Sequence, residues 1–291
     1  MRDEITLDEI KADKRELSEA QKEIATLRET VSRLKNERHY IIPYRSRSNT
    51  IRFGAFSDPH TGSLYERFDA LHEFYKLLKH EKIKHALCPG DVLDGVKMYK
   101  GQEFEQYATG FQSQLNALRE KAPTEKQYGV MTEFITGNHD YSFYKQVGVK
   151  PGPAIAEATG WKYAGQDQKW VDITTEDGQT LTVLLVHPSG GTAYAISYKS
   201  QKYAESIPGG KKPDIVIIGH YHKADWLPME RNMHVFQAGC FQSQTPFMAT
   251  KPTPAHVGGW IIEVTLGNRK HLTGRVKGEF IPFYEPEERI S

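Results

Sequence analysis

Five short apolar runs in this chain each end in a cluster rich in Asp, His, Asn and Gly. The runs are Ile51–Ser57, Ile83–Cys88, Glu133–Thr136, Leu181–Val186 and Ile215–Ile218. Short apolar runs bounded by turn residues predict buried β-strands. Amphipathic helical patterns lie between some of these runs, over residues 65–81 and 104–122. Strands that alternate with helices predict an α/β domain, and in open α/β sheets the carboxyl ends of the strands converge on a shared crevice.

The clusters after these runs carry residue types that bind metal ions. They are Asp58-Pro59-His60, Gly90-Asp91-Val92-Leu93-Asp94-Gly95, Gly137-Asn138-His139-Asp140, His187-Pro188-Ser189-Gly190-Gly191 and Gly219-His220-Tyr221-His222. Side chains at i and i+2 of an extended chain point the same way, so Asp58 and His60 are expected to grip one ion, and His220 and His222 to face one site. The glycines at the start of three clusters are expected to let the backbone turn sharply and approach the ions.

The candidate ligands combine carboxylates, imidazoles and one amide oxygen. They are Asp58, His60, Asp91, Asn138, His187, His220 and His222. Such a set suits Mn, Fe or Zn better than Mg or Ca, and it lacks the thiolates of a structural zinc site. The donors are too many for one ion, so we expect two divalent ions, with Mn²⁺ favoured. Two ions about 3.5–4 Å apart can share a carboxylate and activate a water molecule that attacks phosphorus.

The remaining histidines are expected to be structural or at the surface. They are His39, His72, His80, His85, His234, His256 and His271.

The ordered set DPH, GDVLDG, GNHD, H and GHYH resembles the calcineurin-like metallophosphoesterase superfamily, over about residues 53–222, with later strands consistent to about residue 283. The resemblance implies an α/β fold, a four-layer αββα sandwich of two mixed sheets flanked by helices. It also implies a division of the ligands. Asp58, His60 and His222 would hold one ion, and Asn138, His187 and His220 the other, with Asp91 bridging the two.

The resemblance further implies that His139 binds no metal. This histidine would contact the scissile phosphate or protonate the leaving oxygen, with Asp94 as the partner that orients it. The fourth cluster departs from the usual family pattern, because Pro188 stands where family members commonly have Gly. Proline has no backbone N–H, so one phosphate donor is lost there. The residues expected to bind substrate are therefore Asn138, His139 and, from the turn that follows Pro188, Ser189.

Residues 1–38 differ in character from the rest of the chain, since they contain no Gly, Pro or aromatic residue. Apolar residues recur there in heptads, at Ile10, Leu17, Ile24 and Val31 and again at Ala20, Leu27 and Leu34. This spacing predicts a coiled-coil helix. The helix either packs on its own domain or pairs between chains, and its narrow seam favours pairing into a homo-oligomer. Residues 39–50 are interpreted as a linker, and residues 51–291 as the metallophosphoesterase domain.

Composition narrows the cellular setting. The formal net charge is +1, so the chain as a whole is not drawn to nucleic acid or to an anionic membrane. The two cysteines are not spaced as Cys-x-x-Cys, which fits a reducing compartment. There is no signal-peptide pattern and no run of 18 apolar residues, so we expect a cytoplasmic protein without membrane contact.

Three functions are compatible with these features. The first is a phosphodiesterase that acts on a nucleic acid or a nucleotide-like diester. A nuclease is one form of this function, in which residues 99–122 would form one wall of the substrate groove. The second is a phosphomonoesterase, and the third is a non-catalytic coiled-coil scaffold, which ranks last because no ligand is missing. No arginine lies within a few residues of any ligand, and the nearest cations, Lys97 and Lys223, are point charges. A phosphate monoester dianion is bound best by the planar guanidinium group of arginine. The absence of arginine near the ligands therefore favours diesters, which carry a single negative charge at the phosphate.

Overall fold

The computed structural model describes residues 39–45, 49–191, 193–210, 212–251, 254–267 and 273–284. The coiled-coil helix predicted for residues 1–38 lies outside these ranges and stays a prediction. Within the described ranges, no helix combines the length and the apolar character needed to cross a membrane.

Twelve described strands form two mixed sheets of six strands each. Sheet A has the order β1 (Tyr40–Tyr44), β6 (Gln168–Thr175), β7 (Thr180–Val186), β8 (Ile215–Ile218), β10 (Met233–Ala238) and β9 (Ala224–Glu230). Sheet B has the order β12 (Thr273–Pro282), β11 (Gly258–Leu266), β2 (Thr50–Ala55), β3 (His85–Cys88), β4 (Met131–Thr136) and β5 (Lys162–Gln166). Apolar side chains from both sheets, such as Phe53 of β2 and Leu185 of β7, belong to one buried cluster.

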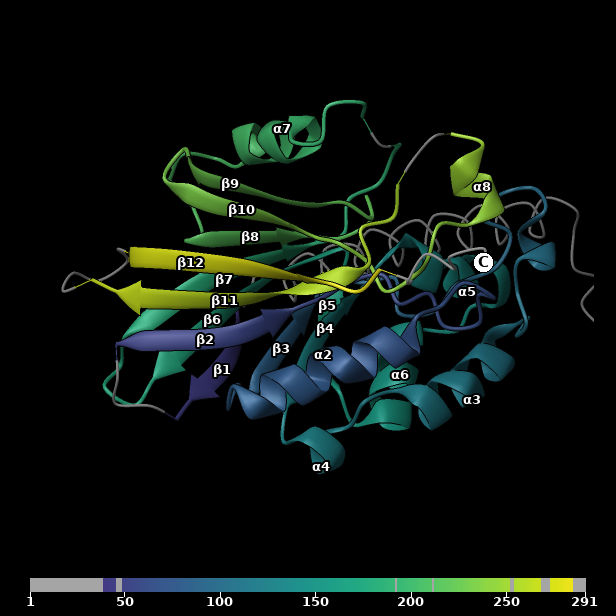
Figure 1. Cartoon of the computed structure of the whole chain (residues 1–291), viewed down its shortest axis with the longest axis horizontal. Coiled ribbons are helices and arrows are strands. Elements are labelled where there is room, and N and C mark those ends of the chain that lie inside the picture. The colour runs from purple at the N-terminus through teal and green to yellow at the C-terminus, as the bar shows by residue number, and fades with distance from the viewer. Residues whose placement is uncertain are drawn as a thin grey trace, which may run out of the picture. The chain divides into compact units, whose positions relative to one another are not determined.

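Helices cover the outer faces of both sheets (Figure 1). The helical segments are α2 (Phe68–His80), η1 (Gln102–Phe104), α3 (Phe111–Lys121), α4 (Glu125–Tyr128), α5 (Asn138–Val147), α6 (Pro151–Thr159), α7 (Tyr198–Ser206) and α8 (Pro246–Ala249). Helix α2 buries Leu71, Phe74 and Leu78 in the core outside sheet B, and Ala204 of α7 packs in a separate core outside sheet A. The fold is therefore the predicted αββα arrangement.

The helix predicted over residues 104–122 is shorter than expected. Phe104, which was placed on its apolar face, lies in the 3₁₀ turn η1 with 81% of its surface exposed. The regular helix α3 begins only at Phe111, directly after Gly110, whose φ of 83° is outside the helical range. Glycine adopts this left-handed conformation at little cost, so it interrupts a helical pattern that the spacing of apolar residues does not reveal.

The linker predicted over residues 39–50 contains a strand. Residues 40–44 form β1, which pairs in parallel with β6 at the edge of sheet A. Ile42 is buried against the core between the sheets, while Ile41 is 66% exposed. Pro43 misled the sequence interpretation, because proline cannot donate in a sheet; an edge strand tolerates it.

The strands that precede the five clusters come from both sheets. Strands β2, β3 and β4 run parallel in sheet B, and β7 and β8 run parallel in sheet A. Their carboxyl ends meet at the end of the sandwich where α5 and α8 lie (Figure 1). The predicted convergence is confirmed, but the shared site lies between two sheets rather than above one.

Candidate metal centre and substrate pocket

The first ligand group consists of Asp58, His60 and His222. Their candidate ligand atoms all lie within 4.8 Å of one another, and all three residues are buried or nearly so. The Nε2 atoms of His60 and His222 are 3.0 Å apart. Oδ1 of Asp58 lies 3.4 Å from Nε2 of His222 and 3.8 Å from Nε2 of His60. Two ring nitrogens that converge beside a buried carboxylate are a donor set that fits a divalent cation.

The second group consists of Asp91, His187 and His220, whose candidate ligand atoms also lie within 4.8 Å of one another. Nε2 of His187 is 2.9 Å from Oδ2 of Asp91 and 3.0 Å from Oδ1 of Asn138. Nδ1 of His187 is 2.6 Å from the carbonyl oxygen of Pro89. A carbonyl only accepts, so Nδ1–H donates and Nε2 lies between two oxygens, where its lone pair could bind a cation once the ring loses its second proton.

His220 is held in the same way with the opposite ring nitrogen. Its Nε2 is 2.6 Å from the carbonyl oxygen of Gly190 and therefore donates, which leaves Nδ1 for an ion. Metal-binding histidines commonly donate their second N–H to a carbonyl or carboxylate, which fixes the tautomer. Both groups thus fit metal ions by donor type, and the second group also fits by ring orientation.

The charges within the clusters oppose the effect of burial. Burial lowers the pKa of His187, but the carboxylate of Asp91 more than compensates and raises it to about 9. Burial likewise lowers the pKa of His60, whereas hydrogen bonding to Asp58 and Asp94 raises it to about 10. The neighbouring carboxylates therefore stabilise positive charge at His60 and His187, where a divalent ion would compete with protons, whereas burial lowers the pKa of His220 to about 4.

Five of the seven candidate ligands have a left-handed backbone. They are Asp58, His60, Asp91, His220 and His222, with φ between 46° and 76°. Only a few per cent of non-glycine residues adopt such values, and they gather at functional sites where the surrounding structure holds them. The reason predicted for the i and i+2 pairs was wrong, because the chain there is turned, not extended. Asp58 and His60 still face one ligand group, whereas His220 and His222 line one pocket but belong to different groups. Backbone bonds between loops, such as Asp58 N–H to the carbonyl of Gly90 at 3.1 Å, hold the turns.

Two cluster glycines permit the close approach of the loops, as predicted. A Cβ on Gly137 would collide with Oδ1 of Asp91 and with the ring of His187. A Cβ on Gly90 would lie 2.7 Å from Nδ1 of His187, and its φ of 106° suits glycine. Larger residues at either position would force the second ligand group apart.

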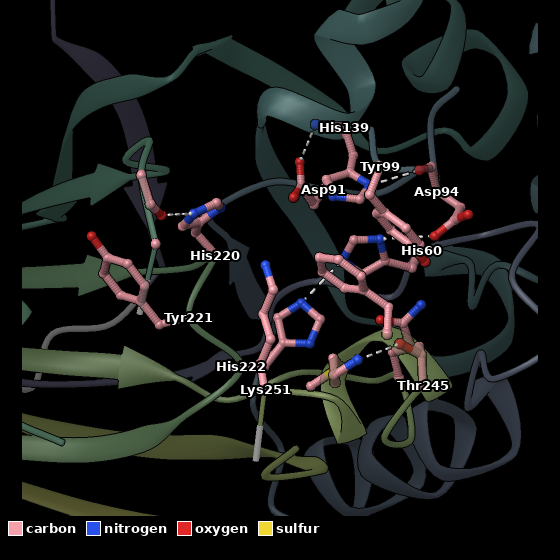
Figure 2. A pocket seen from close by; sticks show the side chains of 15 residues that line it. His60, Asp91, Asp94, Tyr99, His139, His220, Tyr221, His222, Thr245 and Lys251 are labelled. Atoms are coloured by element: carbon pink, nitrogen blue, oxygen red, sulfur yellow. Dashed lines mark hydrogen bonds and ion pairs between the residues drawn. The ribbon is translucent and has the colours of Figure 1, made fainter. Parts of the chain in front are cut away.

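His139 lies beside the second group at the start of α5. Its backbone N–H donates to Oδ1 of Asp91 at 2.8 Å (Figure 2). Nδ1 of the ring is 2.6 Å from the carbonyl oxygen of Asp94, so it carries the proton and leaves Nε2 for other contacts. Ligand atoms of His139 also lie within 4.8 Å of those of His60 and Asp94, so its predicted role as a non-ligand stays a prediction.

Asp94 does orient His139, but through its backbone rather than its carboxylate. Oδ1 of the carboxylate lies 3.2 Å from Nδ1 of His60, and Oδ2 accepts hydrogen bonds from Gln102 at 3.1 Å and Gln106 at 2.5 Å. The side chain therefore supports a candidate ligand, while the carbonyl holds the candidate catalytic histidine.

The residues predicted to bind substrate are not all at the pocket. A cavity of about 460 Å³ is lined by members of both ligand groups and by His139. Ser189 is exposed and does not line it, although its neighbours Gly190 and Gly191 do. The amide oxygen of Asn138 is directed at His187 instead. The backbone of the turn after Pro188 thus reaches the pocket where its serine side chain does not.

The sequence model of the calcineurin-like phosphoesterase family matches residues 51–224, a range that contains all seven candidate ligands. The chain belongs to the calcineurin-like phosphoesterase family. Membership supports the hydrolysis of phosphate esters, and with the two His and Asp groups it supports the binding of divalent metal.

Several solved structures resemble this calcineurin-like phosphoesterase at low identity. A single mutant of Vps29 from Entamoeba histolytica is 15% identical, with 80% of this chain and 100% of that chain covered and a TM-score of 0.36. A conserved uncharacterised protein from Streptococcus pneumoniae TIGR4, a predicted phosphoesterase, is 14% identical, with coverages of 80% and 98% and a TM-score of 0.34. Vps29 from Chaetomium thermophilum is 13% identical, with coverages of 81% and 98% and a TM-score of 0.35. No curated protein matches the sequence.

Part of the phosphoesterase pocket was missed by the sequence interpretation. The lining residues that lie outside the five clusters are Tyr99, Gln242, Thr245, Phe247, Met248 and Lys251. They come from the loop before η1 and from α8 with its flanks, and neither segment has a ligand-like motif. A second omission is Asp140, whose carboxylate accepts the backbone N–H groups of Val92, Leu93 and Gly137 at 2.8–3.2 Å. Its place in the GNHD cluster was the available signal.

Proposed function

We propose that the chain is a phosphodiesterase that uses two divalent metal ions, of which Mn²⁺ is the most effective. The observation that carries this proposal is the meeting of two ligand groups, Asp58–His60–His222 and Asp91–His187–His220, at one pocket beside His139. Divalent ions supply Lewis acidity there, which lowers the pKa of water and neutralises charge on the phosphoryl oxygens. Imidazole donors outnumber carboxylates, and this favours Mn²⁺ over Mg²⁺.

The chain's own residues divide the remaining tasks. Oδ2 of Asp91 faces His187 and Oδ1 accepts the backbone N–H of His139, and in this proposal the carboxylate would also be shared between the two ions. His139 would contact the scissile phosphate through Nε2, since Nδ1 is bonded to the carbonyl of Asp94. In its protonated form the same nitrogen would deliver a proton to the leaving oxygen.

The cations around the pocket support a diester more than a monoester. No arginine is found among the described lining residues. Of the two lysines considered from sequence, Lys97 is exposed and does not line the pocket, and Lys223 donates to the carbonyl of Ala193 at 2.8 Å. A diester carries one negative charge at the reacting phosphate and needs fewer cationic donors than a monoester dianion. The cavity of about 460 Å³ is also large enough for an ester group beyond the phosphate.

A phosphomonoesterase is the second candidate, and one observation favours it. Lys251 lines the pocket and adds a positive charge beyond the metal ligands. A nuclease is a narrower form of the leading proposal; the net charge of +1 gives it no general electrostatic support.

The test compares ester classes on metal-free protein loaded with defined ions. Dialysis against a chelator should abolish hydrolysis, and Mn²⁺ should restore it better than Mg²⁺. With Mn²⁺, bis-p-nitrophenyl phosphate should be cleaved with a higher kcat/KM than p-nitrophenyl phosphate. A monoester preference of tenfold or more would replace the phosphodiesterase with a phosphatase. Full activity in protein shown by elemental analysis to be metal-free would overturn the mechanism, and single- and double-stranded DNA would test the nuclease form.

A further inference from the structure

The part of the pocket lining that lies outside the motif loops includes two segments that are far apart in sequence. Tyr99 lies in the loop before η1, and Phe247 lies in α8. Their rings stack with centroids 4.0 Å apart and planes 13° from parallel. Both residues also bind the same carboxylate: the hydroxyl of Tyr99 donates to Oε2 of Glu105 at 2.7 Å, and the backbone N–H of Phe247 donates to Oε1 at 3.1 Å. The two segments are therefore fixed relative to one another.

Lys251 completes this wall. Its Nζ lies 4.2 Å from the centroid of the Phe247 ring, a cation–π distance. Lys251 lines the same cavity as His60, His139 and His222, and in Figure 2 its side chain extends from the α8 segment towards the pocket interior. Among the described lining residues it is the only lysine or arginine. Lys251 is exposed, and the Phe247 ring supports its ammonium group at the edge of a cavity that is larger than one phosphate needs.

We propose that Lys251 binds a second anionic group of the substrate, separate from the phosphate that is hydrolysed. The inference rests on the proposed function in one respect, since it places the scissile phosphate at the metal groups beside His139. The lining residues come from two sets of segments, the motif loops and the Tyr99–Phe247–Lys251 wall. A substrate that spans both sets has a phosphoester at one end, an apolar or aromatic middle, and a negative charge at Lys251. The chemistry is that of a nucleotide with a further phosphate, in a polynucleotide or as a small molecule.

Binding measurements test this independently of the class of ester that is cleaved. Calorimetry on the Mn²⁺-loaded protein would compare thymidine 5′-phosphate with thymidine 3′,5′-bisphosphate, with the ligands checked for hydrolysis afterwards. Wild-type protein should bind the bisphosphate about tenfold more tightly, as expected of one charge-assisted contact. Lys251→Met, which keeps a long apolar chain over Phe247, should abolish that preference, and Lys251→Arg should retain part of it. Lys97→Met, which removes an exposed charge outside the pocket, is the matched control and should keep the preference.

Activity gives a second readout. The p-nitrophenyl ester of thymidine 5′-phosphate would be compared with the same ester carrying a 3′-phosphate. Lys251→Met should lower kcat/KM about tenfold for the doubly charged substrate and less than about twofold for the singly charged one. Equal losses on both substrates, or equal affinities of wild-type protein for the two nucleotides, would overturn the inference.

Failure to cleave either diester, with the bisphosphate preference intact, would instead reject only the proposed diester specificity. A tetrathymidylate that binds more tightly than the bisphosphate would point to a polynucleotide, and weaker binding to a small nucleotide.

Discussion

Asp91 is the residue that the proposed mechanism shares between the two candidate metal groups. It contributes to the second group directly, and its Oδ1 also holds the N–H of His139. In the proposed mechanism it is shared between the ions, so Asp91→Asn should reduce the content of both metals. Outer-shell substitutions alone cost about 10–100-fold in metal affinity or activity, so loss of a shared ligand should cost more than about 10²-fold in kcat/KM. Elemental analysis and kinetics on the same preparation check this, and the loss of only one ion would show that Asp91 is not shared.

His139 provides the contrasting substitution. His139→Ala should leave metal content unchanged and lower kcat by roughly 10²–10⁴-fold, the range for loss of a general acid. Its ring contacts the protein through the carbonyl of Asp94, so Asp94→Asn should keep that contact while disturbing His60. His80→Ala is a matched control, because the His80 side chain is 83% exposed on α2. If His139→Ala removes metal, His139 is a ligand and the assignment of roles is wrong.

At the scale of elements, Asp140 joins the second and third clusters. Its buried carboxylate accepts backbone N–H groups from Val92 and Leu93 in one loop and from Gly137 in the other. Asp140→Asn would replace one accepting oxygen with a donor and leave buried N–H groups unpaired. The free energy of unfolding should fall by about 1–3 kcal/mol. Chemical denaturation measures it, and Glu157→Gln, at an exposed position of α6, should stay within about 0.5 kcal/mol of wild type. A similarly small change for Asp140→Asn would show that the loops do not depend on it.

The sequence predicted the strand-and-loop part of the site because buried strands read as continuous apolar runs and their ends carry the ligand types. Asp58, His187 and His220 follow such runs directly. The Tyr99–Phe247–Lys251 wall has no comparable run of apolar residues followed by ligand residues. Phe247 and Lys251 reach the pocket through one short turn of helix, α8, and through a stack with Tyr99 about 150 residues away. Long-range packing of this kind leaves no periodic trace in the sequence.

At the scale of the whole molecule, the role proposed for residues 1–38 can be tested by removing them. Every candidate ligand lies after Ile51, so the truncated protein should fold and retain its metal. It should also have a lower oligomeric state, because the heptad seam of Ile10, Leu17 and Ile24 would be lost. Truncation should stop at Arg38, since β1 begins at Tyr40 and buries Ile42. Light scattering on both proteins measures the number of subunits, and an equal number in the two proteins would mean that the heptads do not drive assembly.

Each ligand group draws on both sheets, and this has a consequence for how the protein acquires its ions. Asp58 and His60 follow β2 of sheet B, whereas their partner His222 follows β8 of sheet A. Asp91 depends in the same way on His187 and His220. On a ribosome the chain emerges from its N-terminus at about 5–20 residues per second, so His222 appears roughly 10–30 s after Asp58. Neither group is complete before then, and the ions must therefore be captured by a nearly finished chain rather than guiding its early folding.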